Sequence, residues 1–130
     1  MNFNNFIMFD VVAAVIKKKD KFLIAQRNRH KHLAFKWEFP GGKVETNETH
    51  SEALKREIKE EFNISINILN KISEQKYIDK EINIILHYYL CTHFEGEINL
   101  TEHENYLWIN KKKLKEYDLT EGDNKIINLL

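Results

Sequence analysis

The segment that most constrains this fold is residues 49–62, which read THSEALKREIKEEF and contain no glycine or proline. Thr49 followed by Glu52 matches a capping box, in which each side chain accepts a hydrogen bond from the backbone N–H of the other residue. Just upstream, residues 39–42 read FPGG and contain the only proline of the chain and two of its four glycines. The sequence therefore predicts a glycine turn that leads into a well-capped helix.

Three glutamates share one edge of this helix. Because each helical residue turns by about 100°, Glu57, Glu60 and Glu61 fall within an arc of about 100°. The apolar stripe beside them consists of Leu54, Ile58 and Phe62. Like charges at these spacings cost a few tenths of a kcal/mol per pair, and the helix lysines, Lys55 and Lys59, point elsewhere. We therefore expect a divalent cation with oxygen ligands to balance the carboxylates.

An acidic helix edge, taken alone, is more often a solvated surface than a metal site. Two neighbouring features favour the metal site here. Gly41 and Gly42 let the backbone approach a ligand closely, and their carbonyl oxygens can coordinate a hard cation. Glu48 adds a fourth carboxylate between the turn and the helix. We interpret this segment as a Mg²⁺ site for cleaving a phosphate anhydride.

The rest of the chain predicts a sheet. Apolar or β-branched runs at 10–16 and 22–26 flank a polar stretch and predict a hairpin. Further strands are predicted at 64–68, 73–78, 82–94 and 106–109, a short helix at 111–117, and a C-terminal helix at 123–130. Asp123 is suited to cap the last helix. Strands with one central and one terminal helix predict an α/β (α+β) fold, with a sheet between helices, in one domain of residues 1–130.

Composition excludes several classes of function. The 20 basic residues balance the 20 acidic ones, whereas binding to nucleic acid normally needs a basic excess. No run approaches the ~20 apolar residues of a membrane span. Cys91 is the only cysteine, which rules out an internal disulfide and fits a reducing cytoplasm. Its place in the strand-like run 85–91 predicts a buried small hydrophobe.

The spacing of Gly42, Glu48 and the run REIKEE at 56–61 resembles the Nudix box, the signature of the Nudix hydrolases. The run WEFPGGKVE at 37–45 resembles the MutT branch of that family in particular. A weaker resemblance extends over nearly the whole chain. Asn63 stands where the box usually has a glycine that ends the helix in a left-handed conformation, and asparagine is the next most tolerated residue there. The resemblance implies the Nudix fold, a mixed sheet between helices.

The resemblance also implies a metal-ligand set. By position, Glu57, Glu60 and Glu61 are Mg²⁺ ligands, with Mn²⁺ as a possible substitute. The carbonyl oxygen of Gly41 or Gly42 is expected to complete the set.

Three further charged residues are assigned roles by the same resemblance. Arg56 is expected to orient the acids through a salt bridge with Glu48. Glu102 precedes Trp108 by the spacing at which MutT-like proteins place another acid that reaches the metal site from a loop. Taken alone, Glu102 would more often be a surface residue. Both Glu57 and Glu102 fit the general base, with Glu57 preferred.

The implied reaction converts a nucleoside triphosphate to a nucleoside monophosphate and pyrophosphate. Mg²⁺ polarises the phosphoryl oxygens, and a carboxylate accepts the proton of the attacking water. Arg27 lies where MutT-like proteins use an arginine to contact the nucleotide, Phe39 flanks the substrate loop, and Gly41 is also assigned to substrate binding. Phe39 either lines a pocket or is simply packed. Asp123 is placed either to hydrogen-bond the base edge or only to cap the helix.

The resemblance and the residues together support three hypotheses about function. The first is sanitation of oxidised purine nucleotides such as 8-oxo-dGTP, a role in DNA repair. The second keeps the chemistry but takes a CTP-type pyrimidine triphosphate or another nucleoside-diphosphate-linked substrate. The third is a Nudix-like nucleotide-binding module without catalysis, which the intact set of box glutamates disfavours. The sequence fits a monomer or a dimer equally.

Overall fold

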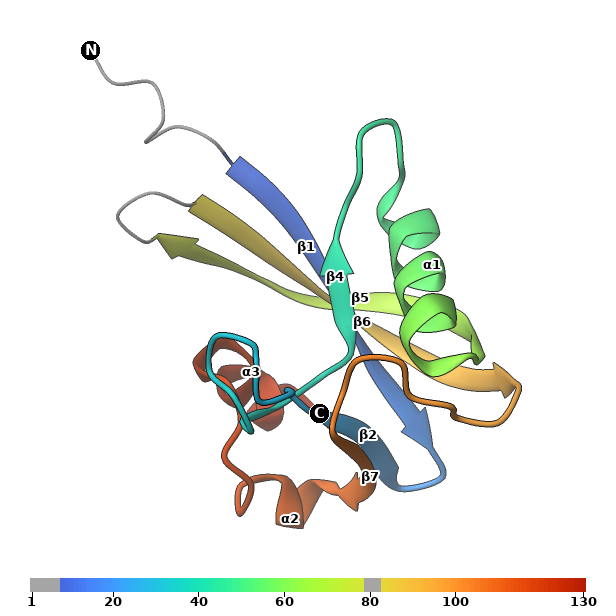
Figure 1. Ribbon diagram of the computed structural model, residues 1–130, viewed down its shortest axis with the longest axis vertical. Helices are drawn as coiled ribbons and strands as arrows, with labels where there is room; N and C mark the ends of the chain where they lie inside the picture. Colours follow the sequence, from blue (N-terminus) through green and yellow to red (C-terminus); the bar gives the residue numbers. More distant parts are fainter. Residues whose placement is uncertain (1–7, 79–82) are drawn as a thin grey trace.

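The computed structural model describes residues 8–78 and 83–130 (Figure 1). Its strands are β1 (Met8–Lys18), β2 (Lys21–Gln26), β3 (Trp37–Glu38), β4 (Gly41–Lys43), β5 (Ser65–Ile78), β6 (Asn83–Glu95) and β7 (Asn105–Asn110). Its helices are α1 (His50–Phe62), α2 (Lys111–Leu114) and α3 (Glu121–Ile126), followed by a 3-10 turn, η2 (Ile127–Leu129). Among the described residues, no helix is long and apolar enough to cross a bilayer.

The strands form one mixed sheet in the order β3-β2-β1-β6-β5, and β4 and β7 pair with β1 and β2 respectively. The pairing of β1 with β6 is parallel, and the other pairings are antiparallel. β1 meets β2 only at the hairpin end and meets β4 across residues 11–13. The sheet therefore splits beside β1, and β4 occupies the split. Gly41 and Gly42, which the sequence predicted to form a turn, are instead part of this strand and pair with β1. The predicted sheet between helices is confirmed.

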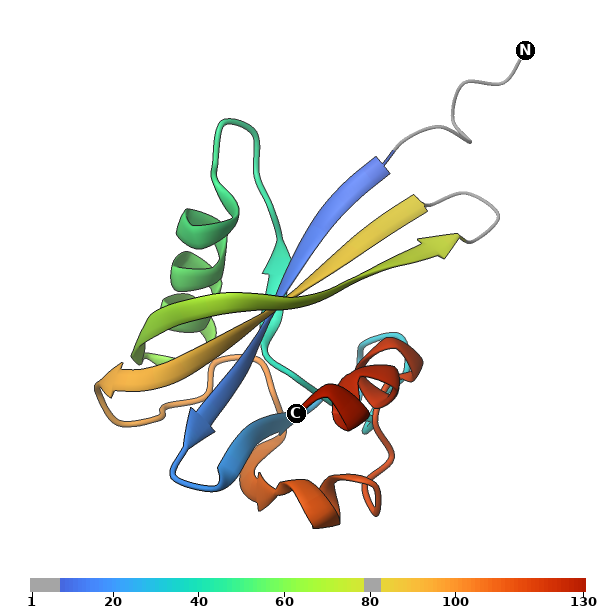
Figure 2. The same cartoon turned by 180° about the vertical axis from the view of Figure 1, so that it is seen from behind.

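α1 and α3 lie on opposite sides of this sheet (Figures 1 and 2). Alternating residues of β1 supply both interfaces, as expected for a strand buried on two faces. Val12, Ala14 and Ile16 pack with the apolar stripe of α1. Ala13 and Val15 pack with the residues of α3 and η2. The two helices thus hold β1 between them, and β1 is the strand with which the two glycines of β4 pair.

The ends of α1 follow the sequence prediction. Thr49 accepts a hydrogen bond from the N–H of Glu52, and the Glu52 carboxylate accepts one from the N–H of Thr49. Asn63 ends the helix with φ of 58°, in the left-handed region. Cys91 is fully buried on β6, as predicted, and burial raises the pKa of its thiol to about 12.

Two predictions for β5 and the C-terminal region were wrong. The strands predicted at 64–68 and 73–78 are one strand, β5, with register shifts near Asn70 and Ser73. Such bulges change which face successive side chains occupy, so they interrupt the alternation that marks a strand in the sequence. The predicted helix 123–130 begins earlier, at Glu121 after Thr120. Asp123 lies within its first turn rather than capping it, because its carboxylate is directed into the core.

Smaller differences concern the edges of elements. The short helix predicted at 111–117 ends at Leu114. Of the strand predicted at 82–94, Ile82 lies outside the described residues.

Candidate active site

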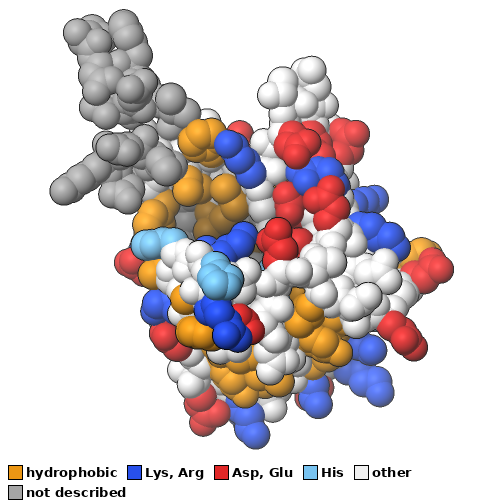
Figure 3. Space-filling view, in the orientation of Figure 1, with side chains coloured by type: hydrophobic (Ala, Val, Ile, Leu, Met, Phe, Trp, Pro, Cys, Tyr) orange, Lys and Arg blue, Asp and Glu red, His pale blue; other side chains and the backbone are white. Residues whose placement is uncertain are grey.

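A cleft of about 570 Å³ opens where β4, α1 and the loop before β7 meet. The acidic residues in its lining include Glu57, Glu60, Glu61 and Glu102. Residues of β1, β6 and α3 also line it, among them Val11, Leu86 and Asp123. Figure 3 shows acidic side chains gathered over the α1 side of the molecule, next to a hollow in this face. The structure therefore brings the predicted metal ligands into a single cleft.

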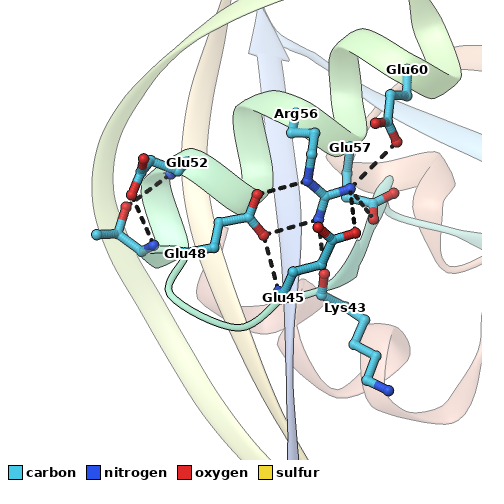
Figure 4. A network of polar contacts seen from close by, with 8 residues as sticks. Lys43, Glu45, Glu48, Glu52, Arg56, Glu57 and Glu60 are labelled. Atoms are coloured by element: carbon cyan, nitrogen blue, oxygen red, sulfur yellow. Dashed lines mark hydrogen bonds and ion pairs between the residues drawn. The ribbon is translucent and has the colours of Figure 1, made fainter.

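Arg56 organises the acidic side of this cleft (Figure 4). Its Nε donates to Glu48 Oε2 at 2.7 Å and its Nη2 donates to Glu48 Oε1 at 3.0 Å. This bidentate pair confirms the predicted salt bridge, and it lowers the pKa of Glu48 to about 2. Nη1 also donates to Glu57 at 3.0 Å and to Glu60 at 3.3 Å. Part of the charge relief that the sequence analysis assigned to a cation therefore comes from Arg56.

Of the three glutamates on the edge of α1, Glu61 is the one that Arg56 does not contact. Burial, with Glu57 close by, raises the pKa of Glu61 to about 8. Its Oε2 is buried and has no hydrogen-bond partner among the described residues. A buried carboxylate oxygen without a donor is costly unless a cation supplies the missing partner. The oxygen-rich set of Glu57, Glu60 and Glu61 therefore fits a hard divalent cation.

Cation binding at this set is expected to strengthen as the pH rises toward 8. A cation requires ionised Glu61, so binding releases a proton, and apparent affinity should fall by up to about tenfold per pH unit below that value. Calorimetric titration with Mn²⁺ at several pH values measures this slope. Without a cation, the free energy of unfolding should decrease as the pH rises from the ordinary glutamate pKa toward 8, because the unfolded chain ionises first.

The control for this measurement is Glu61→Gln, in which the pH dependence of Mn²⁺ affinity should flatten. An affinity that stays constant with pH in the unmodified protein would contradict the assignment of Glu61 to the ligand set.

The two glycines of β4 are required for different reasons. A Cβ on Gly42 would lie 2.3 Å from Cδ of Glu57, so any side chain at 42 would displace that carboxylate. A Cβ on Gly41 would lie 2.0 Å from the carbonyl oxygen of Val12, a backbone atom of β1. Gly42 therefore makes room for the acidic cluster, whereas Gly41 makes room for strand pairing.

We expect Gly42→Ala to lower kcat for triphosphate hydrolysis by about 100-fold with little change in Tm, because Glu57 is displaced from the cleft. Gly41→Ala is expected instead to lower Tm, because β4 must separate from β1. Steady-state kinetics and thermal denaturation of both variants distinguish the two effects. Wild-type kcat in Gly42→Ala would contradict the role given to this close approach.

Glu102 reaches the cleft from the loop before β7, and that loop is fastened to the end of α1. Thr101 donates from its N–H to the carbonyl of Glu61 at 3.2 Å and from its hydroxyl to the carbonyl of Glu60 at 3.1 Å. The Glu102 carboxylate forms an exposed ion pair with Lys31 at 3.2 Å. Glu102 thus lines the same cleft as the acidic cluster, which is the position that the resemblance implied.

The family model of the NUDIX domain matches residues 8–130. This chain belongs to the Nudix family. The "CTP pyrophosphohydrolase" of Escherichia coli is 36% identical over 117 residues, covering 89% of this chain and 86% of that protein. The "8-oxo-dGTP diphosphatase" of Buchnera aphidicola subsp. Schizaphis graminum is 34% identical over 119 residues, covering 92% and 90%. The chain is therefore a Nudix nucleoside triphosphate pyrophosphohydrolase, of a family that uses a divalent metal.

The architecture agrees with this membership. The solution structure of the E. coli ORF135 protein superposes with a TM-score of 0.85 at 32% identity, covering 94% of this chain and 87% of that one. A MutT Nudix hydrolase from Burkholderia pseudomallei superposes with a TM-score of 0.83 at 25% identity, covering 95% and 98%. The mixed sheet and flanking helices are therefore the Nudix fold.

Arg27 of this Nudix domain is held in place by hydrogen bonds inside the protein. Its Nη1 donates to Glu38 Oε1 at 2.7 Å, and its Nε donates to the carbonyl of His32 at 2.7 Å. Glu38, which the sequence analysis missed, also contacts His103 Nε2 at 3.0 Å. Burial acts to raise the pKa of Glu38, but the contacts with His103 and Arg27 outweigh it and hold the pKa below the ordinary value. Glu38 belongs to the MutT-like run 37–45, and this position could have marked it as a site residue.

Phe39 and Asp123 meet at the inner wall of the cleft. Asp123 Oδ2 accepts from the N–H of Phe39 at 2.7 Å, and Oδ1 accepts from the hydroxyl of Tyr88 at 2.6 Å. Burial raises the pKa of Asp123 to about 6 in spite of these hydrogen bonds. The Phe39 ring is almost fully buried. Phe39 therefore orients Asp123 through its backbone, and its ring is packed into the core.

Proposed function

We propose that this Nudix enzyme hydrolyses purine nucleoside triphosphates in the cytoplasm, with oxidised forms such as 8-oxo-dGTP as its preferred substrates. The products are a nucleoside monophosphate and pyrophosphate. The observation that carries the base assignment is the buried carboxylate of Asp123 in the lining of the cleft that also holds the acidic cluster.

The Asp123 carboxylate recognises the base, because its oxygens can accept further hydrogen bonds from the base edge. Each of its oxygens already accepts one hydrogen bond inside the protein, and each has a second lone pair. Two adjacent donors on a base edge match two carboxylate oxygens, and a guanine-type edge offers such donors at its ring N–H and amino group. Phe39 supports this edge by fixing Asp123 through its N–H.

The acidic cluster would hold the divalent cation that binds the phosphate end of the substrate. Glu57, Glu60 and Glu61, with a carbonyl of Gly41 or Gly42, provide the oxygen ligands. When bound, the cation screens the phosphate charge and polarises the phosphoryl oxygens.

The protein's own groups do the rest of the chemistry. Arg56 holds Glu57 and Glu60 in fixed orientations. Glu57, or Glu102 from the facing loop, accepts the proton of the water that attacks phosphorus. Arg27 contacts the nucleotide through Nη2, since its known contacts use Nε and Nη1.

A pyrimidine triphosphate is the second candidate. The similarity to a CTP pyrophosphohydrolase, at 36% identity over 89% of this chain, favours it. The amino group of cytosine would donate to one oxygen of Asp123, which leaves the other oxygen without a new partner. The carboxylate therefore fits a guanine-type edge better than a cytosine edge.

The test is Mg²⁺-dependent release of pyrophosphate from a panel of standard and oxidised nucleoside triphosphates. We expect kcat/KM for 8-oxo-dGTP to exceed that for dGTP by at least about tenfold, a difference of about 1.4 kcal/mol in transition-state binding. A smaller ratio would overturn the preference for oxidised forms, and a higher kcat/KM for CTP would overturn the purine assignment in favour of the second candidate. Hydrolysis of no triphosphate would overturn the whole proposal.

A further inference from the structure

A second polar cluster lies on the α1 side of the sheet, outside the cleft described above. It joins Asp10 of β1, His50 at the start of α1 and His87 of β6, and one ligand atom from each lies within 4.8 Å of the others. His50 and His87 have ring centroids 4.3 Å apart. None of these three residues lines the nucleotide cleft. We propose that this cluster is a binding site for a transition-metal ion of the Zn²⁺ class.

The ligand chemistry fits such an ion and not Mg²⁺. Two imidazoles and one carboxylate form a common three-ligand zinc set, which leaves a fourth position for water. Mg²⁺ prefers oxygen ligands throughout, so it belongs to the glutamate cluster. The two sites therefore select different ions by donor type.

The spacing of the donors fits as well. His87 Nε2 and Asp10 Oδ1 lie 2.8 Å apart and share a hydrogen bond. Two ligands about 2.0 Å from a tetrahedral zinc ion lie roughly 3.3 Å apart, so an ion replaces this proton after a shift of about 0.5 Å. Asp10 is exposed and His50 is half-buried, so both side chains have room to adjust.

Both imidazoles have a partner for the nitrogen that does not bind the ion. His50 Nδ1 contacts the hydroxyl of Tyr89 at 2.8 Å, which leaves Nε2 as its ligand atom. His87 Nδ1 lies 3.2 Å from the carboxylate of Glu74, which can accept a hydrogen bond from Nδ1–H when Nε2 binds metal. Such partners fix the tautomer and the ring orientation of metal-binding histidines.

The positive charge of Lys71 and the positive end of the α1 dipole disfavour cation binding at this cluster, and nearby carboxylates compensate for both. Lys71 Nζ lies 2.9 Å from His87 Nδ1, on the side away from Asp10, and also pairs with Glu74. Once Nδ1 carries a proton, Lys71 remains paired with Glu74 alone. His50 also stands in the first turn of α1, where the helix dipole disfavours positive charge. The carboxylates of Asp10 and Glu74 supply two negative charges against these effects.

The site lies apart from the catalytic centre but on the same helix. His50 and Glu57 are seven residues apart on α1, which corresponds to about 10 Å along the helix axis. A bound ion would join the start of α1 to β1 and β6. It would therefore stabilise the fold without entering the hydrolytic reaction.

The experiment measures Zn²⁺ binding by calorimetry in excess Mg²⁺, which occupies the glutamate cluster, and repeats it with Co²⁺ while following the visible absorption of tetrahedral cobalt. We expect one Zn²⁺ per chain, a rise in Tm on Zn²⁺ addition, and at least tenfold weaker binding in His50→Gln. The hydrolysis rate of His50→Gln with Mg²⁺ should equal that of the unmodified protein.

The matched control is His32→Gln, which changes an exposed histidine of the loop before β3. Its Zn²⁺ affinity should equal that of the unmodified protein. Equal Zn²⁺ affinity in His50→Gln and the unmodified protein, or loss of affinity in His32→Gln alone, overturns the proposal. Absence of Zn²⁺ binding and of the cobalt absorption in the unmodified protein overturns it as well.

Discussion

Replacing Glu57 with glutamine is expected to lower kcat for triphosphate hydrolysis by about 10³-fold while the fold is retained. The glutamine keeps the size of the side chain and can still accept a hydrogen bond from Arg56 Nη1, now 3.0 Å from Glu57 Oε1. It loses the negative charge that a cation requires and the basicity that removes a proton from water. Kinetics at saturating Mg²⁺ and far-ultraviolet circular dichroism measure the two properties separately.

Glu95→Gln provides a matched control for this substitution. Glu95 is exposed at the end of β6 and does not line the cleft. The control should therefore retain the wild-type kcat. An unchanged kcat in Glu57→Gln would show that the metal site has been placed on the wrong residues.

Arg56→Lys is expected to lower kcat/KM by about 100-fold and to lower Tm as well. The guanidinium contacts the side chains of Glu48, Glu57 and Glu60 and the carbonyl oxygen of Lys43. A lysine keeps the charge but cannot form the bidentate pair and the other contacts together. The carboxylates would then repel one another and lose their fixed orientation. Steady-state kinetics and thermal denaturation measure these losses.

Arg29→Lys is the corresponding control. Arg29 is mostly exposed and pairs with Glu104 at 3.2 Å. Exposed ion pairs contribute little to the free energy of unfolding, so kcat/KM and Tm should both remain at wild-type values. Wild-type kinetics in Arg56→Lys would mean that the acidic cluster keeps its geometry without the guanidinium.

Features with a local cause could be predicted from the sequence. α1 is specified by its own capping residues, by the absence of glycine and proline and by a regular apolar stripe. The β1–β2 hairpin is specified by two apolar runs and the polar stretch between them. The salt bridge between Arg56 and Glu48 was implied by the resemblance to the Nudix box, which places Glu48 just before the capping residue Thr49 and Arg56 within α1.

Features that depend on long-range register could not be predicted in this way. The contact of Asp10 with His87 requires parallel pairing of β1 with β6, two strands more than 60 residues apart in sequence. The role of Asp123 depends on Phe39 and Tyr88, which approach it only when α3 packs on the sheet. Its polar character and position indicated a helix cap equally well, because a cap and a buried acceptor use the same side chain.

The attachment of Thr101 to the end of α1 has a consequence for protein engineering. Main-chain oxygens of Glu60 and Glu61 hold this residue, and the amide of Asn28 holds the carbonyl of Glu102. Residues inserted between 96 and 98, which precede these hydrogen bonds, should leave the Glu102 carboxylate in its position in the cleft. Grafts between 101 and 104 would separate it from the helix. The first stretch is therefore the better place to append a reporter peptide or a new recognition arm.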